Sequence, residues 1–196
     1  MRGKHHPFIH LVAILGCVLL ASAIRQKIRS AQELIDLYKD VWDSTVKIDI
    51  DMVNDLDFSG IELQKPLGTR RNDDYGIAYS GVFQGNGHSI KGLIMNNTIM
   101  DASALFYRVA NATFKDLVID SSCMFIGDLA GALSAVGEGS VTLINVRNEA
   151  TITGMYSSSP FITFVYGGTI TLENCVNNGN VNASEGTAAG FIATLA

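Results

Sequence analysis

The chain has 196 residues, of which 47% are hydrophobic and 17% are charged, so its composition excludes an intrinsically disordered protein and suits one compact or elongated domain. The formal net charge is -5, and it becomes more negative if the N-terminal segment that carries Arg2 and Lys4 is removed. No basic cluster remains beyond that segment, which argues against nucleic acid and anionic membrane surfaces as partners.

The first 23 residues have the three parts of a secretory signal peptide. A basic start is followed by the uncharged run Leu11–Leu20 and by small residues at 21–23, which predicts cleavage before Ile24. An uncleaved membrane anchor is one alternative, but the apolar run is short for a span, which needs about 20 residues. A lipoprotein signal at 14–17 is another, and its apolar core would be shorter still. We expect a secreted or extracellular-surface protein with no membrane span in the mature chain.

Residues 30–43 are predicted to form an amphipathic helix. Ser30 and Glu33 have the spacing of a capping box. Apolar residues at helical spacing give one stripe, namely Ala31, Leu34, Ile35, Tyr38, Val41 and Trp42. Beyond that helix apolar and charged residues alternate, as in a half-buried strand. We therefore expect a capping helix within 24–45 and β-structure over 46–196.

The β-rich part contains an internal repeat with an offset of about 29 residues. Apolar, small and polar classes agree between the copies. The aligned triplets are Ala104, Leu133 and Ile162; Phe106, Ala135 and Phe164; Thr113, Thr142 and Thr171; Phe114, Leu143 and Leu172; Leu117, Val146 and Cys175; Ser121, Ala150 and Gly179; and Cys123, Ile152 and Val181. An earlier copy aligns Ile90 with Phe114 at a shorter offset, and a partial last copy begins at Gly190.

A unit of this size, made of strands and tight turns, is one coil of a solenoid. It cannot bury its apolar face alone, so coils stack about 4.8 Å apart with like side chains over one another. We therefore predict an all-β, right-handed parallel β-helix whose N-terminal end is covered by the amphipathic helix, with Trp42 toward the core. The chain stops a few residues into a coil, so we expect the array to be C-terminally incomplete.

Three polar residues, Asp116, Asn145 and Asn174, recur between apolar positions of the repeat. We interpret them as a ladder at a bend, where short polar side chains hydrogen-bond along the stack. The alternative is that each favours a turn locally, without contact between coils.

Two further features bear on an extracellular location. Three N-glycosylation sequons begin at Asn96, Asn111 and Asn182, so a glycoprotein is expected. Cys123 and Cys175 fall at different places in their coils and two coils apart, beyond disulfide reach. We predict that both are unpaired core residues.

Residues 79–93 resemble the F-x-G-x-F-D-G-N-G-H-x-I-x-G-L signature of GLUG-type β-helix repeat proteins, with Gln84 in place of Asp. Residues 104–117 are similar to the segment that follows it in that family, and residues 169–181 to the T-I-x-N-C…G-x-V of the repeat. Many of these proteins are secreted or surface adhesin-like proteins. The resemblance implies a parallel β-helix with an extracellular role, and it supplies no catalytic residues.

Three stretches invite a chemical role. Residues 85–88 (Gly-Asn-Gly-His) are followed by a strand and not a helix, so we interpret both glycines as turn residues with positive φ and His88 as packed at the bend. The aspartates between 49 and 57 fail the spacing of a calcium loop and fit the outer face of a strand. Arg70, Arg71, Asp73 and Asp74 share one loop, where sequence neighbours do not face one substrate bond together. No catalytic residue, metal or cofactor is therefore expected.

The leading hypothesis is a non-enzymatic surface protein, adhesin-like, that binds an extracellular protein or glycan. The alternative is a fragment of a polysaccharide-degrading β-helix enzyme, either a lyase or a glycoside hydrolase. A structural stalk within a larger surface protein also stays open.

Overall fold

The computed structural model describes residues 24–39, 48–69 and 76–195. The elements in chain order are β1 (Ile24–Ile28), α2 (Ala31–Lys39), β2 (Ile48–Met52), β3 (Leu56–Asp57), β4 (Ala78–Tyr79), β5 (Val82–Gln84), β6 (Ser89–Lys91), β7 (Ile94–Ser103), β8 (Phe106–Ala110), β9 (Thr113–Ile119), β10 (Met124–Gly131), β11 (Ser134–Asn148), β12 (Thr151–Ser159), β13 (Ile162–Glu173), β14 (Val176–Asn177), β15 (Val181–Ala183), β16 (Thr187–Ala188) and β17 (Ile192–Leu195). The predicted signal peptide and residues 70–74 lie outside the described residues.

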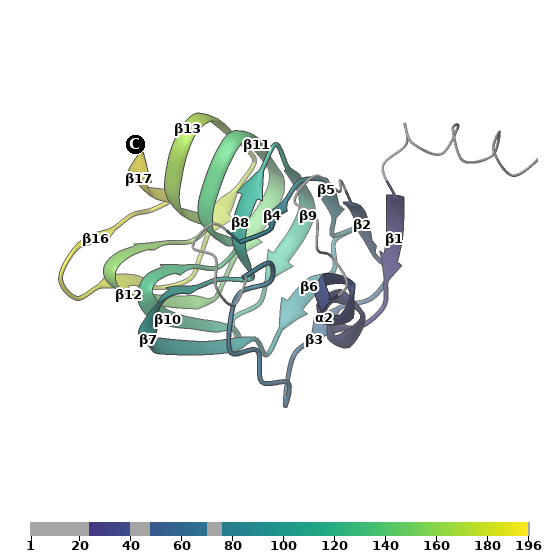
Figure 1. The fold of residues 1–196 in the computed structure, drawn as a ribbon, viewed down its shortest axis with the longest axis horizontal. Helices are drawn as coiled ribbons and strands as arrows, with labels where there is room; N and C mark the ends of the chain where they lie inside the picture. Colours follow the sequence, from purple (N-terminus) through teal and green to yellow (C-terminus); the bar gives the residue numbers. More distant parts are fainter. Residues whose placement is uncertain (1–23, 40–47, 70–75, 196) are drawn as a thin grey trace, which may run out of the picture.

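The strands form a parallel β-solenoid of about 5 turns, which confirms the predicted fold class. The larger sheet has the strand order β1-β2-β5-β9-β11-β13-β17, and the second has the order β15-β12-β10-β7. Successive coils lie side by side in Figure 1, with α2 at the end where the chain begins. No helix in the described part of the chain combines the length and apolar character that crossing a bilayer requires.

The 29-residue offset holds from β9 through residues 140–148 of β11 to the part of β13 that begins at Thr169. Thr142 pairs with Thr113 and Thr171, and Leu143 pairs with Phe114 and Leu172. The alternation of buried and outward positions is regular there because none of these segments contains an inserted residue.

Elsewhere the predicted alignment is wrong by one or two residues. Ser134, and not Leu133 or Ala135, pairs with both Phe106 and Ile162, since the register shifts between Glu138 and Ser140. When an alignment ignores a one-residue bulge, it assigns every side chain before the bulge to the wrong face of the strand.

The turn between β9 and β10 produces a second error. Ile152 pairs with Phe125 and Val181, so Cys123 is not in that column. The turn at 120–123, closed by a hydrogen bond from the Cys123 amide to the Asp120 carbonyl oxygen, is longer than the turn after β11. In the earliest copy Ile90 stacks on Ile119, and it is Phe83 that stacks on Phe114.

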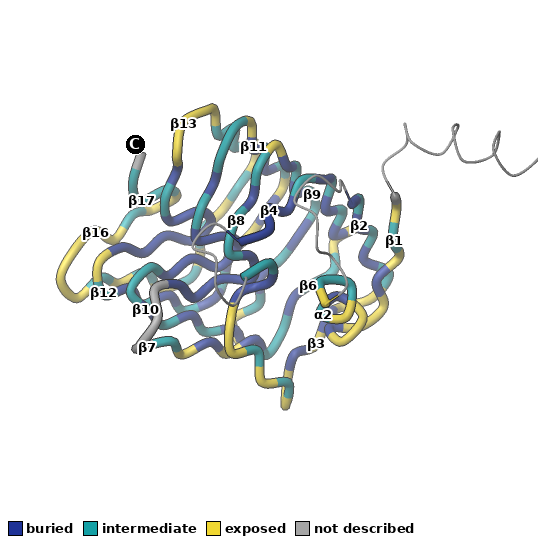
Figure 2. The backbone as a smooth tube through the Cα atoms, viewed as in Figure 1, coloured by how far each residue is buried: buried dark blue, intermediate teal, exposed yellow. Residues whose placement is uncertain are grey.

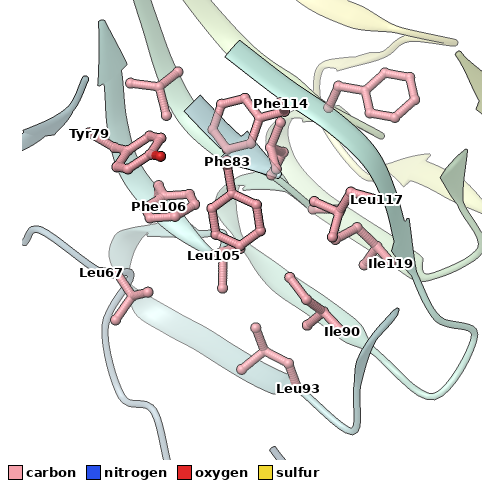
Figure 3. Packing of buried hydrophobic residues seen from close by; sticks show 14 of the residues in the cluster. Leu67, Tyr79, Phe83, Ile90, Leu93, Leu105, Phe106, Phe114, Leu117 and Ile119 are labelled. Atoms are coloured by element: carbon pink, nitrogen blue, oxygen red, sulfur yellow. The ribbon is translucent and has the colours of Figure 1, made fainter. Parts of the chain in front are cut away.

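The interior is a continuous stack of apolar side chains. Ile50, Phe83, Phe114 and Leu143 are fully buried on successive strands of the larger sheet. Phe83, Phe106, Phe114 and Tyr79 gather into an aromatic cluster with ring centroids 5.0 to 6.2 Å apart (Figure 3). Such pairs add to the stabilisation from burial alone.

The central column of the repeat is confirmed. Leu117 and Val146 are fully buried, and Cys175 packs half-buried against the same core at the last coil. Figure 2 shows that buried positions run through the middle of the stack, while exposed positions concentrate at the outer bends and near β16.

The N-terminal cap is described over the helix Ala31–Lys39, within the predicted span. The predicted positions 40–43, Trp42 among them, lie outside the described residues. The Ser30 hydroxyl accepts a hydrogen bond from the Glu33 amide at 3.2 Å, and the Glu33 carboxylate accepts one from the Arg29 amide at 2.8 Å. Ala31 and Leu34 are buried against the first coil.

The segment assigned to the capping helix also begins differently from the prediction. Residues Ile24–Ile28 form β1, which pairs in parallel with β2. The solenoid therefore begins before the helix and not at residue 46, because the alternating side chains of β1 continue the outer and inner columns of β2.

Candidate functional site

The polar residues of the predicted ladder lie in one column at a bend of the larger sheet. Asp116, Asn145 and Asn174 have φ values of 51°, 54° and 50°, a left-handed conformation that Asn and Asp tolerate better than other side chains. The Asn145 side-chain amide donates to the Asp116 carboxylate at 2.8 Å, and the Asn174 amide donates to the Asn145 carbonyl oxygen at 3.3 Å. Gln84 extends the chain of hydrogen bonds by donating to Asp116 at 2.7 Å.

This arrangement also fixes the charge of Asp116. The hydrogen bonds from Asn145 and then Gln84 lower the pKa of the Asp116 carboxyl below its usual value. These hydrogen bonds join residues of adjacent coils, so the column helps to hold the coils in register.

The Gly-Asn-Gly-His stretch is a turn, although one of its glycines acts differently from the prediction. Asn86 and Gly87 have φ values of 54° and 79°, whereas Gly85 has no positive φ. Gly85 is needed for space, since an added Cβ would lie 2.4 Å from the carbonyl oxygen of Asp116 on the next coil. His88 is half-buried, with Nδ1 3.4 Å from the Asp55 carboxylate.

Charged groups gather around Lys91 on the outer face of β3, β6 and the turn after β9. Lys91 Nζ is 2.6 Å from the Asp55 carboxylate, and Asp57 and Asp120 lie close enough to influence it electrostatically. Hydrogen bonds from Lys91 to Asp55, from Ser59 to Asp57 and from Ser122 to Asp120 lower the pKa of all three carboxyls. A general acid for glycoside cleavage needs a raised pKa, so these carboxyls do not fit that role.

The remaining aspartates of the stretch 49–57 are held separately. The Asp49 carboxylate accepts a hydrogen bond from the Val82 amide at 2.8 Å, and Asp51 pairs with Arg25 at 3.6 Å. Among the described residues no group of three or more His, Cys, Asp or Glu side chains has the placement of a metal site.

The three sequons occupy two kinds of position. Asn96 and Asn182 are exposed and fall in one column of the second sheet, with Ile126 and Thr153 between them. Asn111 is exposed at a bend with a φ of 51°, and its side-chain oxygen accepts a hydrogen bond from the Ser140 amide at 3.1 Å.

The cysteines are both free, as predicted. Cys123 is buried, and burial raises the pKa of its thiol to about 11. Cys175 is half-buried, because it belongs to the last described coil and has one neighbouring coil to cover it.

A surface that the sequence did not indicate lies on the outer side of β8, β11 and β13. Val109, Gly137 and Val165 point inward, so the residues that alternate with them point outward. We call these outward residues the outer patch: Arg108, Val136, Glu138, Phe164 and Tyr166.

The outer patch combines aromatic rings with a neutralised pair of charges. The Phe164 and Tyr166 ring centroids are 4.6 Å apart, and Tyr166 is 59% exposed. Arg108 Nε lies 3.6 Å from the Glu138 carboxylate, on the neighbouring coil. The patch therefore presents apolar faces beside hydrogen-bonding groups, which is the composition of many recognition surfaces.

A polar corner borders the outer patch. Thr194 on β17 pairs in register with Phe164, and its hydroxyl lies 3.5 Å from the hydroxyl of Ser157 on β12. The two sheets meet at this corner, where Val136 packs with Leu129 against a small group of buried alanines.

Comparisons with known proteins give the fold and little else. No family model matches the chain, so the resemblance to GLUG-type repeats stays an expectation, and no curated protein matches it. The crystal structure of a putative immunoglobulin A1 protease from Bacteroides ovatus superimposes with a TM-score of 0.58 at 15% sequence identity. The superposition covers 88% of this chain and 62% of that chain, so this chain spans less than two thirds of its neighbour. At 15% identity this similarity shows only that the two chains share a fold.

Proposed function

We propose that the protein is a secreted or cell-surface binding protein of the adhesin-like kind, without enzymatic activity. The observation that carries the proposal is the outer patch: a regular stack of coils holds Phe164 and Tyr166 outward beside charge-paired side chains. A rigid strand that displays aromatic residues supplies contact area at a low entropic cost.

The state of the polar clusters supports binding over catalysis. The charged groups around Lys91 are paired with one another, and the pKa values of Asp55, Asp57 and Asp120 are lowered and not raised. A glycoside hydrolase, one form of the polysaccharide-degrading alternative, would call for a carboxyl with a raised pKa near a second carboxylate. The name of the Bacteroides ovatus neighbour suggests proteolysis for that protein, and a likeness at 15% identity carries the fold alone.

Secretion is part of the proposal and has its own test. A positively charged start, an uncharged run and small residues at 21–23 support cleavage before Ile24. N-terminal sequencing of the protein released by a secretory host should begin at Ile24. A released protein that begins at Met1, or one retained in the membrane fraction, would remove the secretory part of the proposal.

Binding and catalysis are separated by one set of assays on the purified secreted protein. We expect saturable retention on extracellular matrix or cell-surface preparations and no change in the molecular mass of polysaccharide or protein substrates. The release of oligosaccharide or peptide products by the wild-type protein would contradict the proposal.

A further inference from the structure

We infer that the outer patch binds a neutral glycan, with Tyr166 and Phe164 as the platform for a sugar ring. The inference rests on the proposed binding function and names its ligand class and its residues. Phe164 and Tyr166 lie on one strand, and the parallel register of β11 and β13 brings Val136 and Glu138 beside them.

The first step of the argument is the geometry of the two rings. Phe164 and Tyr166 are two positions apart on β13, on the same side of the strand, with ring centroids 4.6 Å apart and planes inclined by 47°. Tyr166 is 59% exposed, so much of its side chain is open to solvent and within reach of a ligand. The apolar C–H face of a pyranose stacks on such rings, while the hydroxyls at its rim stay available for hydrogen bonds.

The second step is the polar rim. Tyr166 pairs in register with Glu138, whose carboxylate is an acceptor for sugar hydroxyls. Thr194, in register with Phe164, adds a hydroxyl that can donate and accept, and the buried hydroxyl of Ser157 lies 3.5 Å from it. Aromatic rings flanked on both sides by groups that can hydrogen-bond to hydroxyls fit a carbohydrate better than they fit the apolar face of a peptide.

The third step is charge. Arg108 and Glu138 lie 3.6 Å apart and neutralise each other within the outer patch, and the whole chain has a net charge of -5. An acidic polysaccharide would meet a carboxylate at the patch and a repulsive protein around it. The patch therefore favours a neutral glycan over a uronic acid polymer.

The test is affinity gel electrophoresis of the full-length secreted protein through laminarin, galactomannan and polygalacturonate. We expect retardation by a neutral polysaccharide and none by polygalacturonate. Tyr166→Ala should weaken the apparent affinity at least tenfold and Phe164→Ala several-fold, whereas Tyr166→Phe, which keeps the ring, should stay within about threefold of the wild type.

Tyr156→Ala is the matched control, because Tyr156 is 54% exposed and belongs to the second sheet, on β12. It should bind as the wild type does. Far-UV circular dichroism and the urea midpoint should be unchanged in all four variants, which separates lost binding from lost folding.

Three results would overturn the inference while leaving the proposed binding function in place. They are retardation by polygalacturonate alone, equal weakening by Tyr156→Ala and Tyr166→Ala, and no retardation by any of the three polysaccharides from a protein that is retained on cell-surface preparations. Shortening of a polysaccharide during the run would instead overturn the proposed function itself.

Discussion

Replacing Phe114 with alanine removes the centre of the aromatic cluster and should destabilise the whole stack. Phe114 is fully buried, and its ring lies 5.6, 5.7 and 5.8 Å from those of Tyr79, Phe83 and Phe106. Burial of a phenylalanine side chain removes about 150–250 Å² from water, worth about 4–6 kcal/mol at 25 cal/mol per Å². Because neighbouring rings relax into part of the space, we expect a loss of about 3–5 kcal/mol.

Two further variants make the result specific. Leu143 occupies the equivalent place on the next coil, so Phe114→Leu keeps a side chain that the column accepts. It should lose about 1–2 kcal/mol, mostly from the ring contacts. Tyr156→Ala, at an exposed position, should stay within about 0.5 kcal/mol of the wild type.

The assay is urea unfolding followed by far-UV circular dichroism, with the slope of the transition compared between variants. A single transition with an unchanged slope licenses the comparison of free energies, since a stack of coils can also unfold in parts. A loss below about 1 kcal/mol for Phe114→Ala would refute the interior stacking of the aromatic rings.

Three other predictions concern particular side chains. Gly85→Ala should destabilise by about 1–3 kcal/mol in urea unfolding, because its Cβ would meet the Asp116 carbonyl oxygen, and an unchanged midpoint would exclude that close approach. Because the pKa of Asp116 is lowered in the folded state, its carboxylate stabilises the fold above the unfolded-state pKa, and this stability is lost as the pH falls through the folded-state pKa. Asp116→Asn should therefore flatten the dependence of the unfolding free energy on pH below about pH 4. A pH dependence parallel to that of the wild type would contradict the ladder's effect on this carboxyl. At pH 8 a disulfide reagent should label Cys175 at least about tenfold faster than Cys123, whose pKa is raised to about 11, and labelling at equal rates would contradict the burial of Cys123.

The sequence was most informative where the strands contain no inserted residue. Thr113, Thr142 and Thr171 share a column, as do Phe114, Leu143 and Leu172, because strict alternation and a constant offset carry the same information as the hydrogen-bond register. The ladder residues could be singled out for a related reason: bends that require a left-handed residue select Asn and Asp in every coil.

A one-residue bulge hides the outer patch from such an alignment. The constant offset placed Phe164 over Ala135, in the interior, whereas the shift between Glu138 and Ser140 places it over Val136, facing outward. β13 has two glycines with positive φ, Gly167 and Gly168, where β11 has Gly139 alone, so an additional glycine in one copy is the signal that could have revealed the shift.

The first strand could not be predicted for a different reason. β1 has a mixed sequence, Ile-Arg-Gln-Lys-Ile, that begins at the expected cleavage site and is followed at once by a helix. Its strand character comes from pairing with β2, where Ile24 meets Ile48 and Ile28 meets Met52, and not from local preference.

The stacking of equivalent side chains is tested most directly by a cross-link between neighbouring coils. Val146 and Cys175 precede the register pair Arg147 and Val176, so their Cα atoms should lie about 4.8 Å apart, within disulfide reach. In Val146→Cys, mild oxidation followed by peptide mapping should find a disulfide between positions 146 and 175, whereas Ile144→Cys, two residues away, should leave its new thiol free. No link in the first variant, or an equal yield of links to Cys175 in the second, would contradict the parallel register on which the outer patch depends.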